Sequence, residues 1–247
     1  MAMSDRWVAI MSYLKEHEEV TVEELMEAFN ASRSTVRRDL IAMEKQGLLQ
    51  RTRGGAKLFM KQTMGSYGYT LDGLLEEHKA EKELIAKKAA SLVQEGDIIF
   101  LDSGTTCYYI IDYIAAKDIT VVTNGIMHIN KLMSKGIRTY ILNGYAVPEN
   151  NLIIAEDTYE KVERMNFSIA FIGSMGIHAS GGYTTMTSID GRLKAAVIKA
   201  AEKCYVVADH SKMNKRQFYT YGYFDEAPLI TDREVPFEHE ALQVIYT

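Results

Sequence analysis

The stretch Ala31-Ser-Arg-Ser-Thr-Val-Arg-Arg-Asp-Leu-Ile-Ala-Met-Glu-Lys-Gln-Gly-Leu-Leu-Gln-Arg-Thr-Arg-Gly-Gly-Ala56 decides the fold of the N-terminal part of this chain. Its first half predicts a helix, because Val36, Leu40 and Met43 recur at helical spacing and form one apolar stripe. Ser32 is a good N-cap for this helix, since its hydroxyl can accept hydrogen bonds from the free N–H groups of the first turn. The segment is therefore a helix with one face made for packing.

Polar residues gather off this stripe, toward the start of the helix. A recognition helix has this layout, because its N-terminal residues meet base edges and phosphates. Gly47 is expected to end the helix as the C′ residue, and a short strand follows from Leu48 to Arg51. The turn Thr52-Arg53-Gly54-Gly55 is basic and can lie on a phosphate backbone. We therefore predict DNA contacts from the helix and this β-wing, through Ser32, Ser34, Thr35, Arg37, Arg38, Arg51 and Arg53.

Basic charge is concentrated in the same segment. Residues 31–61 carry eight Lys and Arg side chains against two acidic ones, a formal +6 in a chain of net −5. A basic island in an acidic protein is the electrostatic signature of nucleic-acid binding. Arginine pairs on helices are common in themselves, and the alternative is a solvated amphipathic helix with a hairpin. The charge distribution favours DNA.

The residues before this stretch complete a small helical domain. Residues 5–16 predict a first helix, with Trp7 on its apolar face and therefore in the core. Thr21 and Glu24 have the spacing of a capping box, which starts a second helix that runs to about Phe29. Helix, helix, turn, helix and wing make a winged helix-turn-helix domain, which we assign to residues 1–60.

The segment from Ser32 to Ala56 resembles the signature of the DeoR family of bacterial transcription regulators. One residue departs from that pattern: the family has His before the Gly-Gly of the wing, where this chain has Arg53. Another cation at this position should keep phosphate affinity, while fine contacts change.

Composition bounds the rest of the chain. It has 247 residues and no run of about 18 apolar ones, so no transmembrane helix is expected. The N-terminus has no apolar signal core. Cys107 and Cys204 lie far apart without metal-ligand spacing, which suggests reduced thiols and a cytoplasmic location.

The C-terminal part has the pattern of an α/β domain. Residues 61–78 predict a connector without helical or strand period, and residues 79–247 the domain, with a net charge of −6 over 62–247. Short apolar runs alternate with helical segments, which predicts a mostly parallel sheet covered on both faces. The expected strands are 98–101, 119–123, 139–142, 168–172, 204–208, 229–231 and 242–246; the expected helices are 81–96, 105–116, 126–135, one within 152–164, and 189–203.

Ligands of such sheets bind at the carboxyl ends of the strands. Asp102-Ser-Gly-Thr-Thr106 follows the first strand, and the hydroxyl and N–H groups of its threonines can face an anion at a helix start. A capping turn with no ligand is nearly as good an interpretation of this motif alone. Other strand ends carry Asn124, Asn143, Gly173 to Gly176 and Asp209 to Lys212. Together they suit a small phosphorylated polyol.

Residues 75–235 also resemble the effector-sensing domain of the DeoR family. The resemblance implies a fold similar to ribose-5-phosphate isomerase and the CoA transferases, and a sugar phosphate that alters DNA affinity. By the family pattern the phosphate would lie on Gly104, Thr105 and Thr106, with Lys194 and Lys212 in the same pocket. The full set of expected effector residues is Asp102, Gly104, Thr105, Thr106, Asn124, Gly176, Lys194, Asp209 and Lys212. Asn143, Asp190 and Gly191 replace the family's usual residues.

Two functions remain open on these residues. The first is a regulator, a repressor of carbohydrate-metabolism genes that binds double-stranded operator DNA and a phosphorylated sugar as a homodimer or homotetramer. The alternative is a sugar-phosphate isomerase or transferase, although no base–nucleophile pair of known spacing is visible. An interaction module alone would leave the basic wing unexplained. We expect no catalytic residues, metal or cofactor. The aromatic run Tyr219-Thr-Tyr-Gly-Tyr-Phe224 serves either assembly or a core hairpin.

Overall fold

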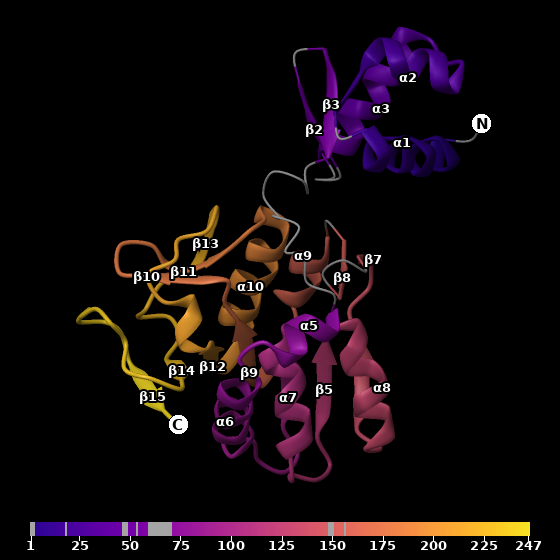
Figure 1. Ribbon diagram of the computed structural model, residues 1–247. Helices are drawn as coiled ribbons and strands as arrows, with labels where there is room; N and C mark the ends of the chain where they lie inside the picture. Colours follow the sequence, from indigo (N-terminus) through magenta and orange to yellow (C-terminus); the bar gives the residue numbers. More distant parts are fainter. Residues whose placement is uncertain are drawn as a thin grey trace. The chain divides into compact units, whose positions relative to one another are not determined.

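The computed structural model describes residues 3–17, 19–45, 49–52, 54–58, 71–147, 151–155 and 157–247 (Figure 1). It divides into two compact units, residues 1–68 and 69–247. The expected helix end at Gly47, the wing residue Arg53 and most of the connector lie outside the described residues. None of the helices in the described part is long and apolar enough to cross a membrane.

The first unit is a winged helix-turn-helix, as predicted. It contains α1 (Met3–His17), β1 (Glu19–Thr21), α2 (Val22–Phe29), α3 (Arg33–Lys45), β2 (Leu49–Arg51) and β3 (Gly55–Leu58). The strands form an antiparallel sheet in the order β1-β3-β2. The capping box at the start of α2 is present, with Thr21 Oγ1 and the Glu24 carboxylate each accepting from the other's backbone N–H. β1 was not predicted, because three residues are too few to show a period.

One apolar core holds this unit together. The predicted stripe of Val36, Leu40 and Met43 is buried and packs against Leu14 of α1 and Leu25 of α2. Burying a side chain of this size contributes about 1.5–3 kcal/mol. The packing face of α3 is therefore committed to the core, and its opposite face is left for solvent or a ligand.

The second unit contains more elements. Its helices are α5 (Leu71–Glu76), α6 (Lys79–Ala90), α7 (Thr105–Tyr113), α8 (Ile126–Ser134), α9 (Thr158–Val162), α10 (Ser188–Ala200) and the 3-10 helix η2 (His210–Lys212). Its strands are β4 (Ile98–Leu101), β5 (Thr120–Thr123), β6 (Arg138–Ile141), β7 (Tyr145–Val147), β8 (Leu152–Ile154), β9 (Phe167–Gly173), β10 (Gly176–His178), β11 (Gly182–Thr185), β12 (Ala201–Val207), β13 (Tyr219–Gly222), β14 (Leu229–Thr231) and β15 (Val244–Tyr246).

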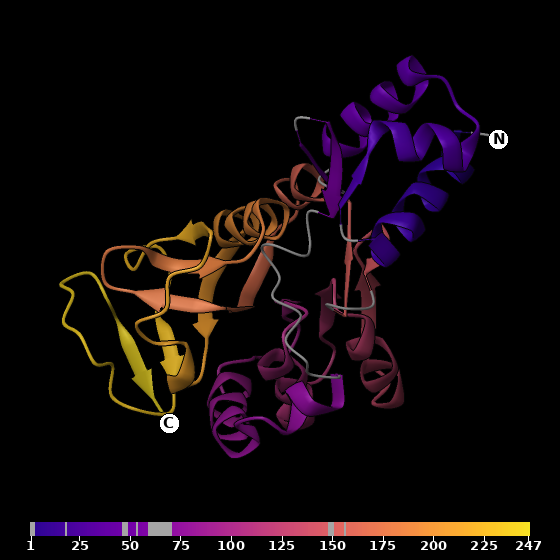
Figure 2. The same cartoon turned by 45° about the horizontal axis from the view of Figure 1, so that its top comes forward.

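Seven of these strands form the predicted parallel sheet, in the order β15-β14-β12-β9-β4-β5-β6. Successive strand residues face opposite sides, so Phe100 packs with α10 whereas Ile99 and Leu101 pack with α6 and α7. Figure 2 shows α10 in orange on one side of the sheet and α6 and α7 in purple on the other. All strands run the same way, and their carboxyl ends therefore share one edge of the sheet.

Two predictions of local structure were wrong. The helix predicted within 152–164 is present as the short α9, although the strand β8 precedes it and pairs with β7. The helix expected over 105–116 ends at Tyr113, because Ile114 has an extended backbone. The connector expected over 61–78 contains α5. The helix α5 has six residues, too few for a helical period to stand out, and the apolar residues 114–116 continue the pattern of α7 beyond its end.

A second sheet of the unit, β10-β11-β13, is antiparallel and was not predicted. It contains the aromatic run whose function the sequence left open. Tyr221 and Phe224 are buried in the core, while Tyr223 is 60% exposed. The run is therefore mainly a core strand.

Candidate functional site

The start of α3 presents polar side chains to solvent. Ser32 caps the helix as predicted: its Oγ accepts from the backbone N of Thr35 at 3.3 Å and lies 2.8 Å from Thr35 Oγ1. Ser34, Arg37 and Arg38 are exposed. Within the described residues neither Arg37 nor Arg38 forms an ion pair. Both guanidinium groups are thus available for phosphates or base edges.

The opposite side of α3 is anchored by Asp39. This carboxylate is buried, forms an ion pair with Arg6 and accepts from Trp7 Nε1 at 3.2 Å. Trp7 packs against the core, as the sequence predicted. Arg6 and Trp7 of α1 therefore hold the recognition helix in place through Asp39.

The wing differs from its prediction in one contact. Arg51 was expected on DNA, yet its Nε donates to Glu44 Oε2 at 2.8 Å and its backbone N donates to Glu44 Oε1 at 2.9 Å. These hydrogen bonds lower the pKa of Glu44 below its ordinary value. Glycine is required where the wing meets β1, because a Cβ on Gly55 would lie 1.8 Å from the carbonyl oxygen of Val20. With Nε held by Glu44, the Nη groups of Arg51 are the donors that could meet a phosphate.

In the second unit, Asp102 and Lys194 meet at the carboxyl end of β4. Lys194 Nζ lies 2.6 Å from Asp102 Oδ2 and donates to the Gly173 carbonyl at 3.2 Å. The backbone N of Gly173 donates to the same Asp102 oxygen at 2.9 Å. Both side chains are almost fully buried. The structure therefore brings together two of the predicted effector residues, and with them the end of β9.

Asp190 is the second carboxylate beside Lys194. Its Oδ2 lies 3.5 Å from Lys194 Nζ and accepts from Thr185 Oγ1 at 2.6 Å. Burial acts to lower the pKa of Lys194, but Asp102 and Asp190 together raise it above its ordinary value. Burial raises the pKa of Asp190. The residue that departs from the family pattern is thus part of the charge network.

Several buried polar atoms beside this network have no hydrogen-bond partner among the residues that the structure describes. They are Asp102 Oδ1, both amide atoms of Asn124 and both ring nitrogens of His128. Asn124 follows β5, the neighbour of β4 in the sheet. Burial lowers the pKa of His128 to about 4, so its imidazole is neutral near pH 7. Buried polar groups are normally paired, and unpaired ones at a strand end indicate a place for a polar guest.

One residue of this edge was missed by sequence reasoning. Asn151 is buried, its Oδ1 accepts from the backbone N of Met127 at 2.8 Å, and its Nδ2 donates to the Ser103 carbonyl at 3.4 Å. It therefore connects the loop before α7 with the start of α8. Its backbone has φ 54°, which Asn tolerates better than most residues. An Asn pair at 150–151 was the available signal.

The threonines of the predicted anion loop open α7. Gly104 is the N-cap and has no side chain that could cap the helix. Thr105 is partly exposed, and Thr106 is buried. A helix N-terminus favours negative charge, because its N–H groups and dipole face the ligand. The predicted helix start at Thr105 is confirmed, and the phosphate at this helix start stays a prediction.

Two further predicted effector residues follow a strand that does not neighbour β4. Asp209 and Lys212 follow β12, which is separated from β4 by β9 and therefore by roughly 10 Å. Asp209 Oδ1 accepts from the backbone N of Ser211 at 2.9 Å, and its Oδ2 is buried without a partner. Lys82 of α6 is also buried, with its Nζ donating to the Leu74 carbonyl at 2.6 Å. Lys82 was not among the predicted residues.

Gly176 has a structural reason to be glycine. A Cβ there would lie 2.5 Å from the Lys215 carbonyl oxygen, between the strands of the second sheet. No contact of Gly176 joins it to Asp102 or Lys194 in the part of the chain that the structure describes. Its prediction as an effector residue rested on the motif alone.

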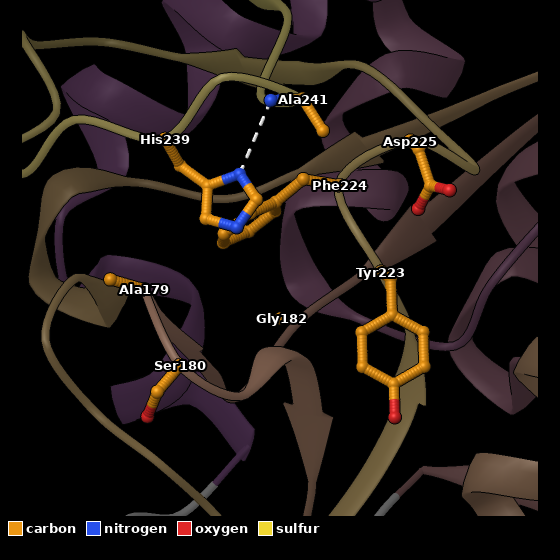
Figure 3. A pocket seen from close by; sticks show the side chains of 8 residues that line it. All are labelled: Ala179, Ser180, Gly182, Tyr223, Phe224, Asp225, His239 and Ala241. Atoms are coloured by element: carbon orange, nitrogen blue, oxygen red, sulfur yellow. Dashed lines mark hydrogen bonds between the residues drawn. The ribbon is translucent and has the colours of Figure 1, made fainter.

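A surface hollow of about 480 Å³ lies elsewhere in this unit (Figure 3). It is lined by small residues, aromatic rings and one carboxylate, and Figure 3 shows the His239 ring accepting from the backbone N of Ala241. The lining residues are Ala179, Ser180, Gly182, Tyr223, Phe224, Asp225, His239 and Ala241. None is a predicted effector residue, and no cation in this lining would hold a phosphate.

A winged helix with free arginines, joined in one chain to an α/β unit with unpaired polar groups at its strand ends, defines a DNA-binding regulator with a separate sensing unit. Models of known families match both units: the DeoR-like helix-turn-helix domain over residues 6–62 and the DeoR C terminal sensor domain over residues 77–233. The chain belongs to the DeoR family of transcriptional regulators.

Curated relatives agree over nearly the whole chain. The HTH-type transcriptional regulator FruR of Bacillus subtilis is 38% identical, covering 94% of this chain and 91% of its own. The HTH-type transcriptional repressor GlcR of the same organism is 37% identical, with 94% and 90% covered. The lactose phosphotransferase system repressor of Staphylococcus aureus is 28% identical, with 92% and 90% covered. This chain is accordingly a DNA-binding transcriptional regulator and not an enzyme.

Among solved structures, ribose 5-phosphate isomerase A of Methanocaldococcus jannaschii aligns with a TM-score of 0.40 and 18% identity. The alignment covers 55% of this chain and 54% of the isomerase, so this chain spans about half of that protein.

Proposed function

We propose that this regulator represses carbohydrate-metabolism genes, and that a phosphorylated sugar bound in its second unit changes its affinity for operator DNA. Two of its relatives are repressors by name, and one of these belongs to a lactose phosphotransferase system. These names concern the relatives, and the support from this chain itself is the geometry of its two units.

The DNA side of the proposal rests on α3 and the wing. Ser34, Arg37 and Arg38 face solvent at the start of α3, where a helix lying in the major groove meets base edges. Operators are commonly read as two half-sites by two copies, and we expect a homodimer or homotetramer. The exposed edge strand β6, with Tyr140 54% and Ile141 42% exposed, offers a surface for such assembly.

The observation that carries the effector side is the row of unpaired buried polar atoms at the strand ends. Asp102 Oδ1 and the Asn124 amide are buried and unpaired on two neighbouring strands. A sugar hydroxyl can donate to the carboxylate and both donate to and accept from the amide. The phosphate would lie at the start of α7, on Gly104, Thr105 and Thr106. Lys212, on a different strand end, would supply further positive charge.

Fluorescence anisotropy on DNA from upstream of the protein's own gene, at about 150 mM salt, tests both sides. We expect specific binding that a single member of a panel of phosphorylated sugars weakens. Thr105→Ala should abolish that response and keep DNA binding, whereas Arg37→Ala should weaken DNA binding and keep sugar-induced thermal stabilisation. Specific DNA binding that no sugar phosphate alters would refute the effector side alone. Weak binding that salt erases would refute the DNA side.

A further inference from the structure

A cluster of imidazole and carboxylate groups lies beside the candidate effector site. His78 and Glu81 are at the start of α6, and His210 begins η2 after β12. One ligand atom from each of the three lies within 4.8 Å of the other two. The rings of His78 and His210 meet edge to face, with centroids 5.2 Å apart. All three side chains are partly buried.

Asp232 holds one of these ligands in place. Its Oδ2 lies 2.8 Å from His210 Nδ1, and its Oδ1 accepts from the His210 backbone N at 2.7 Å. The carboxylate therefore favours a proton on Nδ1 and leaves the lone pair of Nε2 free. A carboxylate behind a histidine in this way orients and strengthens a metal ligand. Neither the function proposed above nor the core packing needs this arrangement.

We propose that His78, Glu81 and His210 form a binding site for a divalent transition metal, with Zn²⁺ as the preferred ion. Two imidazoles and one carboxylate are a ligand set that suits Zn²⁺ and leaves its fourth position for water or another ligand. Zn²⁺ bonds of about 2.0–2.2 Å put ligand atoms roughly 3.4 Å apart in a tetrahedron. The ligand atoms now lie within 4.8 Å of one another, and side-chain rotations that bring them about 1.4 Å closer give the spacing of a bound ion.

The backbone and the surrounding charges fit this proposal. His78 has φ 51°, an uncommon conformation for a residue other than glycine, and it makes no capping hydrogen bond. Arg233 now lies 3.4 Å from Glu81, but its side chain is 61% exposed and can leave. Asp209 and Asp232 add negative charge near the ligands, against Lys82 and Lys212. Metal binding would fasten the first turn of α6 to the turn after β12.

Isothermal titration of the full-length, chelator-treated and tag-free protein with ZnCl₂ tests the site, with Co²⁺ absorption as a second readout. We expect one bound ion, and visible bands of a low-coordinate Co²⁺ complex. Glu81→Gln is nearly isosteric and should weaken Zn²⁺ binding more than tenfold with an unchanged circular dichroism spectrum. Asp232→Asn should weaken it about 10- to 100-fold by releasing His210.

His239→Ala is the matched control, because His239 is exposed and outside the cluster. It should bind Zn²⁺ like the original chain. Arg233→Gln should bind at least as tightly, since it removes the cation that competes for Glu81. Equal affinity in Glu81→Gln and in the original chain would overturn the proposal, as would the loss of binding in His239→Ala. The sugar-phosphate panel is absent from this titration, so failure of the effector proposal leaves its result unchanged.

Discussion

The two units of this chain keep their functional side chains in opposite environments. In the DNA-binding unit Arg37 and Arg38 are exposed and make no ion pair in the described structure, while Val36 and Leu40 form the core. In the sensor unit Asp102 and Lys194 are buried and hold each other. Exposed charges contribute little to folding, whereas a buried pair that loses one partner destabilises strongly. Substituting a functional residue should therefore change DNA binding without changing stability in the first unit. In the second unit, the same kind of substitution should change both effector binding and stability.

Removing Lys194 gives the sharpest test of that difference. Lys194→Met leaves the Asp102 carboxylate buried without its cation, and we expect a loss of about 3–5 kcal/mol in the free energy of unfolding. Urea denaturation followed by circular dichroism measures it. Trp7, the only tryptophan of the chain, lies in the first unit, and its fluorescence transition should stay in place.

The double variant Asp102→Asn with Lys194→Met is the control. It removes Asp102 and Lys194 together and leaves Asp190, whose pKa burial raises, so most of the lost stability should return while effector binding is lost. If Lys194→Met lowers the free energy of unfolding by less than about 1 kcal/mol, the Asp102–Lys194 pair is hydrated and contributes as little as an exposed ion pair. The proposed contrast between the units would then disappear.

The pH dependence of the sensor unit provides the second test. His128 has a pKa of about 4 in the folded chain, against about 6.5 in an unfolded one. As the pH falls through this window the unfolded state takes up the proton first, and stability is lost. The loss is on the order of 3 kcal/mol at the lower end.

Replacing His128 by Phe should flatten the pH dependence between about 6.5 and 4.5, above the range where most carboxylates titrate. The measurement is urea denaturation at several pH values, again with Trp7 as the internal reference for the first unit. His178→Gln, a change at a partly exposed histidine, should keep the slope of the original chain. An unchanged slope in His128→Phe would place the titrating group elsewhere.

The same contrast explains what the sequence could predict. The recognition helix, its apolar stripe and its basic surface were all visible because they lie within one local stretch with a clear period. The parallel sheet followed from apolar runs. Asp102 and Lys194 were assigned to one effector site, but their direct pairing was not predicted, because Lys194 lies far away in the chain. Asn151 had only the Asn pair at 150–151 as a signal, because its hydrogen bonds join segments that are distant in the sequence. The strands β10, β11 and β13 have three to four residues each, too few for a period of two to stand out.

Removing charge from the recognition surface should affect DNA alone. Arg37→Ala and Arg38→Ala are each expected to cost about 1–3 kcal/mol in DNA binding if the side chain reads a base, and to lower the salt slope by about one if it contacts a phosphate. The Trp7 unfolding transition should move by less than about 0.5 kcal/mol, as for other exposed residues. Arg138→Ala, an exposed charge in the sensor unit, is the control for net charge. A shift of the unfolding transition comparable to the loss of affinity would show that these arginines also support the fold.

The helix cap of α2 allows the reverse experiment, a loss of stability that leaves DNA binding intact. Thr21 Oγ1 accepts from the backbone N of Glu24 at 3.1 Å, and Thr21→Ala should lower the stability of the first unit by about 1 kcal/mol. Thr21→Ser keeps the accepting oxygen and should retain most of it. Thr21 meets the wing through the backbone pairing of β1 with Gly55, which the substitution keeps, so anisotropy on operator DNA should change less than twofold in a unit that stays folded. A larger loss of affinity in Thr21→Ala, restored in Thr21→Ser, would show that the position of α3 depends on the cap and that the two properties are coupled here as well.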